Sequence, residues 1–329
     1  MPESHELKTA FVKVVLVTHN YGGQCYEQSQ IDGIIGQDGL VEQLIIPPNW
    51  RLPKLESVDA VVICVRFREL LLNGIDWNGF EGLRVLQDQD SFMDFAGWHG
   101  SSPYEGRWLW ALREFNFDAL ICTGEKSVNH FREAGIKAEV IYKGFDENLF
   151  FSELHDRQGI CHYGNAYDAR KAMLRTLERS GTEVVPVAST YERLNSELNK
   201  HAVCLICNMT SQYQLGRLGS SIERIRPGSL LRLQEAPEPM IKNFEAAAAG
   251  CCVFMDQVSD LDLLGFEDGW NCVLYSTFDE LGAKLDFYKS EPGLVAEIGC
   301  RAESMVHERH SWRHRGQDFR RVISEWLDQ

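Results

Sequence analysis

The stretch that decides the fold is Pro237-Glu-Pro-Met-Ile-Lys-Asn-Phe-Glu-Ala-Ala-Ala-Ala-Gly250, followed by Cys251-Cys-Val-Phe-Met-Asp256. The two prolines suit the first turn of a helix, the four alanines favour its continuation, and Gly250 supplies a stop. The apolar residues from Cys251 to Met255 predict a buried strand. We therefore expect a helix over 237–249 that leads directly into a strand.

One carboxylate, Glu245, lies in the apolar part of this helix, three residues after Lys242. A charge in such a place is costly unless it has a partner. Residues three apart share a helix face, so one interpretation is an ordinary surface salt bridge. The functional interpretation is that Glu245 binds a vicinal diol such as a ribose, while Lys242 and the helix N-terminus bind phosphate. These residues alone leave both interpretations open.

Composition sets limits on what the protein does. The chain has 329 residues, which suggests two domains of roughly 150 residues each. No run approaches the ~18 apolar residues that a membrane span needs, and Met1 to Thr9 lacks a signal-peptide core. The net charge of −15 argues against a nucleic-acid partner, which requires basic surface. We expect a cytoplasmic protein that has no membrane span and binds no nucleic acid.

The ten cysteines are expected to be reduced thiols. Cys204-Leu-Ile-Cys207 is a C-x-x-C pattern inside an apolar run, and the sequence has no second pair to complete a zinc site. Cys251 and Cys252 also lie in a predicted strand. Free cysteine is commonly just buried, so we interpret these residues as structural and expect no metal there.

The first half of the chain alternates between apolar runs and helix-like segments. Near-continuous apolar runs are typical of strands that are covered on both faces. Strands alternating with helices, such as the one expected over 125–134, predict a parallel α/β sheet. The runs are 13–18, 41–46, 59–65, 83–87, 119–123 and 138–142.

The pattern restarts after a connector at 144–150, so we expect a domain boundary near 151–157. A strand over 159–163 enters a glycine loop, and an amphipathic helix follows over 169–179. Further strands are expected over 183–187, 202–207, 251–255 and 271–275, and helices over 278–288 and 295–308. The segment 312–327 predicts a last helix, with its apolar residues on one face.

Lys242-Asn-Phe-Glu-Ala-Ala-Ala-Ala-Gly250 resembles the nucleotide-sugar signature of glycosyltransferases with the two-domain GT-B fold. It is most similar to the group-1 (GT4-like) transferases and the spore-maturation CgeB-like branch. In those families the Glu hydrogen-bonds the ribose of the donor. Val140 to Phe150 is similar to the sequence motif at the end of their first domain. His310 to Arg315 is similar to the motif at which their last helix crosses back to that domain.

The resemblance implies an α/β fold with two Rossmann-like doubly wound domains. The chain would divide into an acceptor-side domain over 1–152, a nucleotide-sugar-binding domain over 153–310, and a C-terminal helix over 311–329 that crosses back to the first domain. It covers 138–315 by motif, and residues 1–137 by architecture alone.

The predicted donor site begins with Gly164, Asn165 and Arg170. A glycine loop between a strand and a helix allows backbone N–H groups to approach a diphosphate, and an arginine binds phosphate through two hydrogen bonds. The pattern resembles the opening of the second domain in CgeB-like proteins, and the signature around Glu245 follows about 80 residues downstream. Asn208, at the end of a predicted strand, matches the Leu-x-x-Asn pattern that ends the corresponding strand in the family. A plain turn glycine is the alternative for Gly164.

Asp88-Gln-Asp90 follows a predicted strand, at the edge where open α/β sheets bind ligands. Asp88 or Asp90 could act as the general base for an acceptor hydroxyl. Alternatively, the pair could be the metal-binding D-x-D of the GT-A transferase fold, with Mn²⁺ or Mg²⁺ on the donor diphosphate. The first interpretation fits the two α/β halves better. A solvated acidic loop is the third possibility.

Two histidines and one long loop complete the candidates. His19 ends the first predicted strand beside a Gly-Gly pair, and His99 lies in a Gly-rich segment. The resemblance makes both candidates for contact with donor or acceptor, and the alternative is a hydrogen-bonded loop histidine. The segment 211–235 is rich in Gly, Ser and Arg, so it is either a phosphate-facing loop or a solvated one.

The sequence departs from the family at one point. Group-1 members usually carry Glu-x7-Glu, but counting back from Glu245 places Pro237 at the first position, and Glu238 is one residue off. Which carboxylate meets the transferred sugar is therefore left open, as is the stereochemistry.

We expect a metal-independent, hexosyltransferase-type glycosyltransferase that uses no cofactor. Its donor would be a nucleoside-diphosphate sugar of the UDP or GDP type, and its acceptor the hydroxyl of a sugar, glycan or small molecule in the interdomain cleft. The alternatives are a GT-B epimerase or phosphorylase, a non-catalytic protein of the same fold, or a metal-dependent transferase that uses Asp88 and Asp90.

Overall fold

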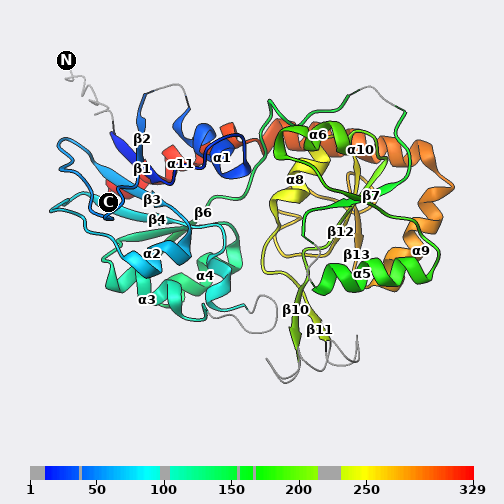
Figure 1. The fold of residues 1–329 in the computed structure, drawn as a ribbon, viewed down its shortest axis with the longest axis horizontal. Coiled ribbons are helices and arrows are strands. Elements are labelled where there is room, and N and C mark those ends of the chain that lie inside the picture. The colour runs from blue at the N-terminus through cyan, green and yellow to red at the C-terminus, as the bar shows by residue number, and fades with distance from the viewer. Residues whose placement is uncertain (1–11, 37–38, 97–103, 154–155, 166–167, 214–230) are drawn as a thin grey trace, which may run out of the picture.

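The computed structural model describes residues 12–36, 39–96, 104–153, 156–165, 168–213 and 231–329. Figure 1 shows two lobes, each built on a parallel sheet with helices on both faces. This architecture confirms the expected pair of Rossmann-like α/β domains. The two sheets lie on either side of the predicted boundary at 152/153.

The first sheet has six parallel strands in the order β2-β1-β3-β4-β5-β6. Successive side chains of β1 point to opposite faces. Val15 and Val17 pack into one core cluster and Val14 and Leu16 into the other, so the apolar run is buried on both sides. The strands are β1 (Val14–Thr18), β2 (Val41–Ile45), β3 (Ala60–Cys64), β4 (Leu83–Gln87), β5 (Ala119–Cys122) and β6 (Lys137–Val140).

The second sheet has five strands in the order β13-β12-β9-β7-β8, all parallel. Its strands are β7 (Ile160–Tyr163), β8 (Val185–Val187), β9 (Val203–Ile206), β12 (Cys252–Asp256) and β13 (Val273–Tyr275). A separate antiparallel pair, β10 (Thr210–Tyr213) with β11 (Leu231–Gln234), projects from this lobe (Figure 1).

Helices cover both faces of each sheet. In the first domain, α1 and α11 pack on one face and α2, α3 and α4 on the other. In the second, α6 and α8 cover one face, α5 and α9 the other, and α10 contributes to both clusters. The helices are α1 (Tyr26–Ile35), α2 (Phe67–Asn73), α3 (Arg107–Glu114), α4 (Glu125–Glu133), α5 (Asp168–Arg179), α6 (Tyr191–Leu198), α8 (Ile241–Ala248), α9 (Phe278–Lys289), α10 (Pro292–Arg309) and α11 (Trp312–Leu327), with a short 3₁₀ turn, η1 (Ser91–Asp94).

The last helix crosses back to the first domain, as predicted. Phe319, Val322, Ile323 and Trp326 of α11 are buried against the first sheet. α11 approaches α1 closely because both helices carry glycine at the crossing. A Cβ at Gly33 would lie 2.5 Å from the Cβ of Trp312.

The structure corrects two expectations. The key helix does not begin at Pro237: α8 begins at Ile241, after an extended Met240 whose N–H bonds the side chain of Asn243. Pro239 explains this, because a proline disfavours helical backbone in the residue before it. The segment 211–235 is not simply a loop, since its ends form β10 and β11.

Both sheets reverse their strand order at a central point. In the first sheet β1 lies between β2 and β3, and in the second β7 lies between β8 and β9. Successive connections therefore leave the central strand in opposite directions. Such switch points, at the carboxyl ends of the strands, form the crevices in which α/β proteins bind ligands. The fold thus offers one candidate site in each domain.

Candidate functional site

The crevice of the second domain begins at the exit of β7, where Gly164 has a left-handed φ of +74°. A Cβ at this position would overlap the ammonium group of Lys242, which approaches from α8. Only glycine permits both this backbone and this approach. The predicted pairing of the glycine loop with the α8 signature is therefore a direct contact in the structure.

Lys242 and Glu245 do not form the surface salt bridge that remained possible from the sequence. The Lys242 ammonium donates to the carbonyl oxygen of Tyr163 at 2.6 Å, and the Tyr163 hydroxyl donates to Glu245 Oε2 at 2.9 Å. Glu245 is only 2% exposed. Tyr163 thus separates the two charges, and both face the end of β7.

Burial shifts the pKa values of both Glu245 and Lys242. Desolvation raises the pKa of Glu245 to about 7, against the lowering effects of hydrogen bonding to tyrosine and of Lys242. Desolvation lowers the pKa of Lys242 to about 7, and the nearby Arg170 lowers it further. Both groups therefore sit near half-protonation at neutral pH, so a bound ligand could readily change their charge.

Several buried polar atoms at this edge have no hydrogen-bond partner among the described residues. They are Glu245 Oε1, Asp256 Oδ2 and both polar side-chain atoms of Asn208. Asn208 follows β9 and Asp256 ends β12, and the Asn208 N–H donates to Asp256 Oδ1 at 2.6 Å. Buried polar groups are usually hydrogen-bonded, so these unpaired atoms indicate a binding site for a polar ligand with several hydroxyl or N–H groups.

Arg170 is placed differently from the expected phosphate ligand. Its guanidinium donates to the backbone carbonyls of Asn165 at 2.7 Å and Cys207 at 3.0 Å, and the side chain is only 8% exposed. These bonds tie the loop after β7 to the end of β9. Asn165 itself is exposed in that loop. A contact between Arg170 and phosphate stays a prediction.

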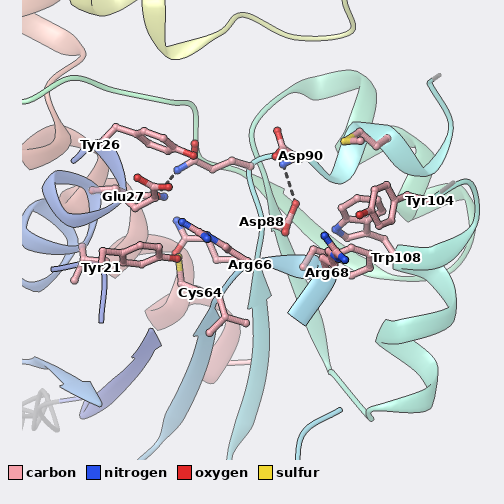
Figure 2. Close-up of a pocket in the computed structure, with 17 residues that line it drawn as sticks. Tyr21, Tyr26, Glu27, Cys64, Arg66, Arg68, Asp88, Asp90, Tyr104 and Trp108 are labelled. Atoms are coloured by element: carbon pink, nitrogen blue, oxygen red, sulfur yellow. Dashed lines mark hydrogen bonds between the residues drawn. The ribbon is translucent and has the colours of Figure 1, made fainter. Parts of the chain in front are cut away.

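The crevice of the first domain holds a cavity of about 330 Å³. Figure 2 shows its walls: α1 and the loops after β1, β3 and β4, with Tyr104 and Trp108 on the opposite side. Its volume is at the small end of the range for ligand sites, which suits a ligand of about one sugar ring. Aromatic and charged side chains are mixed along its lining.

Asp88 and Asp90 both line this cavity, but their environments differ. Asp88 is buried and its Oδ1 accepts the N–H of Asp90 at 2.8 Å, whereas Asp90 is exposed. Burial raises the pKa of Asp88 to about 8, and the charge of Asp90 adds to the effect. Desolvation also raises the pKa of Asp90, while Lys143 lowers it. Asp90 is therefore better placed to meet a hydroxyl, and Asp88 shapes the loop.

The histidines contribute less to this cavity. His19 lies behind its wall, edge-on to Tyr21 and Trp50 and 3.4 Å from Glu69. Burial lowers the pKa of His19. His99 and most of the 211–235 loop lie outside the described residues, so their proposed roles stay predictions.

Sequence reasoning missed two arginines of the cavity. Arg66 and Arg68 follow β3 and line the site, while Phe67 between them is buried and stacks on Trp108 at a centroid distance of 3.7 Å. Their position directly after an apolar strand was the available signal, because side chains there reach the carboxyl edge of a sheet.

A buried ion pair, also missed, connects the two domains. Glu238, fully buried just before α8, pairs with Lys143 from the end of the first domain. The Thr123 hydroxyl contacts both Glu238 Oε1, at 2.5 Å, and the carbonyl oxygen of Gln89, at 3.1 Å. Gln89 lies between Asp88 and Asp90. The loop that carries those carboxylates is therefore linked through Thr123 to the segment that leads into α8.

The described residues also bear on metal binding and on membrane insertion. Within the described ranges, no group of three or more His, Cys, Asp and Glu side chains is arranged to hold a metal ion. The ten cysteines form no disulfide. In the same part of the chain, every helix is too short or too polar to cross a membrane.

Comparison with known proteins identifies the architecture. Residues 170–321 match the family described as Glycosyl transferase-like. The Anabaena protein Alr3699/HepE, solved in complex with UDP and glucose, is similar with a TM-score of 0.61 at 14% identity, over 95% of this chain and 100% of that one. No curated protein sequence matches significantly.

Two further solved structures agree with this assignment. Sucrose-phosphate synthase from Thermosynechococcus elongatus has a TM-score of 0.58 at 10% identity, over 96% of this chain and 99% of that one. A glycosyltransferase from Rickettsia africae has the same TM-score, identity and coverage. Together with the family match, these similarities confirm the resemblance to GT-B glycosyltransferases. The CgeB-like branch stays a prediction.

Proposed function

Because the chain has the GT-B fold and its second half matches the Glycosyl transferase-like family, we propose that it transfers a sugar from a nucleoside-diphosphate sugar to an acceptor hydroxyl. The second-domain crevice would bind the donor, and the first-domain cavity the acceptor. UDP is the favoured nucleotide, because the similar Anabaena protein was solved with it. Transfer of a hexose without a metal or a cofactor is part of the proposal.

The observation that carries this proposal is the set of buried, unpartnered polar atoms around Glu245. A ribose presents two adjacent hydroxyls, and Glu245 Oε1 is a buried acceptor that receives no hydrogen bond within bonding distance from a described residue, although the Tyr191 hydroxyl lies near enough to lower the pKa of Glu245. The diphosphate would lie against Gly164 and the Lys242 ammonium, which meet at the end of β7. Positive charge held there would stabilise the diphosphate as negative charge develops on it during transfer.

The acceptor side supplies the groups for proton transfer. Asp90 is exposed to the cavity, and desolvation raises its pKa above the ordinary value, which makes its carboxylate a stronger base for an acceptor hydroxyl. Asp88 would hold the loop through its bond to the Asp90 N–H. The contacts of Thr123 and Lys143 with Glu238 keep this loop next to the segment before α8.

Calorimetric titration with UDP, GDP, ADP, TDP and CDP, each with and without EDTA, tests the donor site. We expect micromolar binding of one nucleotide, unaffected by EDTA. The Glu245→Gln variant keeps the shape of the side chain but loses its charge, and should weaken binding by about tenfold or more. Glu297→Gln, on an exposed face of α10, is the matched control and should bind as the unmodified chain does.

Each other outcome contradicts part of the proposal. Binding that requires a divalent metal would favour the alternative in which Asp88 and Asp90 hold the ion. Binding without consumption of the corresponding nucleotide sugar, in the presence of a broad acceptor panel, would favour a non-catalytic protein. Absence of nucleotide binding would contradict the donor site itself.

A further inference from the structure

The first-domain cavity contains two arginines that form no ion pair with a described residue, although the carboxylates of Glu27, Asp88 and Asp90 also line it. Arg66 and Arg68 line it, and neither forms an ion pair with a described residue. The guanidinium of Arg66 faces the ring of Tyr21, at 5.8 Å from its centroid. Arginine stays charged at all physiological pH values. In a chain of net charge −15, two unpaired arginines in one cavity are a specific feature and not a consequence of composition.

The arginines are also held in place. Phe67 lies between them in sequence, is buried, and stacks face to face on Trp108, whose side chain is 1% exposed. This anchor fixes the start of α2 against the core, so the flanking side chains extend from a rigid base (Figure 2). An anchored backbone reduces the conformational freedom that these side chains lose when they bind a ligand, compared with residues on a flexible loop.

The cavity also has a side that suits a hydroxyl. Asp88 and Asp90 come from the loop after β4, whereas Arg66 caps α2 after β3 and Arg68 lies in the first turn of α2 (Figure 2). Burial raises the pKa of Asp88 to about 8, which leaves it largely neutral at pH 7 and limits its repulsion of an anion. Tyr104, which is partly exposed, offers an apolar contact at the side of the cavity where Arg68 lies (Figure 2).

We propose that the acceptor is a small polyol or sugar that carries an anionic group, such as a phosphate, which either Arg66, beside Tyr21, or Arg68, beside Trp108, binds while a hydroxyl faces Asp90 (Figure 2). This inference rests on the proposed function and specifies its substrate class. Guanidinium groups bind phosphate through paired, charge-assisted hydrogen bonds. The cavity volume of about 330 Å³ limits the part of the acceptor that enters to about one ring with its charged group.

The test compares acceptors in charged and neutral pairs. Glucose with glucose 6-phosphate, and inositol with inositol 1-phosphate, are titrated calorimetrically into the full chain, both alone and saturated with the nucleotide that it binds. We expect the phosphorylated member of at least one pair to bind about tenfold tighter or more. Inositol 1-phosphate in solution is compared with phosphatidylinositol in phosphatidylcholine vesicles, which distinguishes a free phosphate from a lipid headgroup.

Arginine variants assign the effect to the cavity. The double variant Arg66→Met and Arg68→Met keeps apolar side chains of similar length and should abolish the preference for the charged member. Its nucleotide affinity should be unchanged, which also shows that it folds. The double variant Arg321→Met and Arg313→Met makes the same change in net charge at exposed positions of α11, and should keep the preference.

The possible failures are distinguishable. If nucleotide binds but charged and neutral members bind equally, or no charged member binds, the anionic acceptor is wrong while the donor site stands. If the preference persists in the Arg66 and Arg68 variant, the charge is recognised elsewhere and the inference is also wrong. If no nucleotide binds, the proposed function fails, whatever the acceptor titrations show.

Discussion

The two candidate sites occupy corresponding crevices of similar domains, yet they are built in opposite ways. In the second domain the charged groups are buried: Glu245 is 2% exposed and Asp256 is fully buried. In the first domain Arg66, Arg68 and Asp90 are exposed on loops and on the first turn of α2, around an open cavity. One site is part of a hydrophobic core, and the other is attached to its edge.

This difference has an energetic consequence. A buried charge is tolerated only with compensating contacts, so a change in the second-domain crevice should affect folding and binding together. Surface substitutions usually change stability by less than about 0.5 kcal/mol. The acceptor cavity can therefore change its lining at little cost to the fold, which allows acceptor choice to vary while donor binding is kept.

The largest expected loss of stability comes from substituting Lys143, which is buried although it lies on the otherwise exposed acceptor side. Lys143 lies beneath the acceptor loop but is buried, and its ion pair with Glu238 crosses between the domains. Lys143→Met leaves the buried Glu238 without its counter-ion, and should lower the free energy of unfolding by about 3–5 kcal/mol. Urea denaturation measures this change.

The control is the exposed interdomain pair Lys126–Glu235, at 3.2 Å. Lys126→Met should cost less than about 1 kcal/mol. Adding Glu238→Gln to Lys143→Met should recover much of the lost stability, because the uncompensated charge is then removed. Equal effects of the Lys143 and Lys126 substitutions would contradict the role given to the buried pair.

A smaller effect is expected at Gly164, and it sharpens the comparison for the donor side. Gly164→Ala places a Cβ against the Lys242 ammonium and forces a left-handed residue with a side chain. We expect a loss of about 1–2 kcal/mol in stability and about tenfold in nucleotide affinity. Thermal denaturation and nucleotide titration measure the two effects.

Gly181 provides a matched control, with a φ of +78° and no atom within 4 Å of a Cβ placed there. Gly181→Ala carries the same backbone strain, of about 1 kcal/mol, without the contact. Its nucleotide affinity should be unchanged. If both alanine variants bind nucleotide equally well, Lys242 and the glycine loop do not form the diphosphate site.

Proton exchange on donor binding tests the buried charges more finely. Lys242 and Glu245 both have a pKa of about 7. A bound diphosphate favours the ammonium and raises the Lys242 pKa, so protons are taken up mostly above pH 7. Ribose hydroxyls favour the carboxylate and lower the Glu245 pKa, so protons are released mostly below pH 7.

Binding of UDP-glucose should therefore take up most of a proton at pH 8 and release most of a proton at pH 6. Calorimetry in buffers of different ionisation enthalpy measures both quantities. Lys242→Met should abolish the uptake at pH 8, and Glu245→Gln the release at pH 6. A proton balance that does not vary with pH would show that neither group meets the donor.

The smallest effect is expected at Asp90, the exposed carboxylate of the acceptor side. Asp90→Asn should change stability by less than about 0.5 kcal/mol and leave nucleotide affinity unchanged, while lowering the rate of transfer by about 10²-fold or more. Stability comes from urea denaturation, and the transfer rate from an acceptor identified in the charged panel.

Nearby Asp94 shows what a buried carboxylate does on the same side. It accepts the N–H of Trp108 at 2.7 Å and contacts His130 at 2.9 Å. Asp94→Asn should cost about 1–3 kcal/mol in stability. If Asp90→Asn is equally destabilising, Asp90 belongs to the core and the contrast between the two crevices does not hold.

The strands were predictable from the sequence because sheets covered on both faces leave continuous apolar runs. Helices α1, α2, α3 and α6 were missed; no side-chain cap marks where they begin, but the same is true of α4, which was predicted. The β10–β11 pair was also missed, within a polar segment. Tertiary pairing, which local composition does not record, forms these elements.

The donor edge was more predictable than the acceptor cavity for a similar reason. Gly164, Lys242 and Glu245 lie in two local patterns, a strand with a glycine loop and a helix with one acidic residue. The cavity joins Arg66, Asp90 and Trp108 from three separate segments, so no local pattern contains it. From the sequence, Glu238 stood out only because it lies one residue away from the first Glu of the Glu-x7-Glu pattern. Its pairing with Lys143 could not be predicted, because the two residues are far apart in sequence.

The return of α11 to the first domain has a consequence for biosynthesis. Val14, Leu16 and Ile31 receive their cover from Phe319 and its neighbours, which a ribosome adds last among the described elements. At about 5–20 residues per second, the interval between β6 and α11 takes about 10–30 seconds. During that time α1 alone covers this face of the first sheet and the area that α11 buries stays open, so a growing chain would complete its second domain before its first.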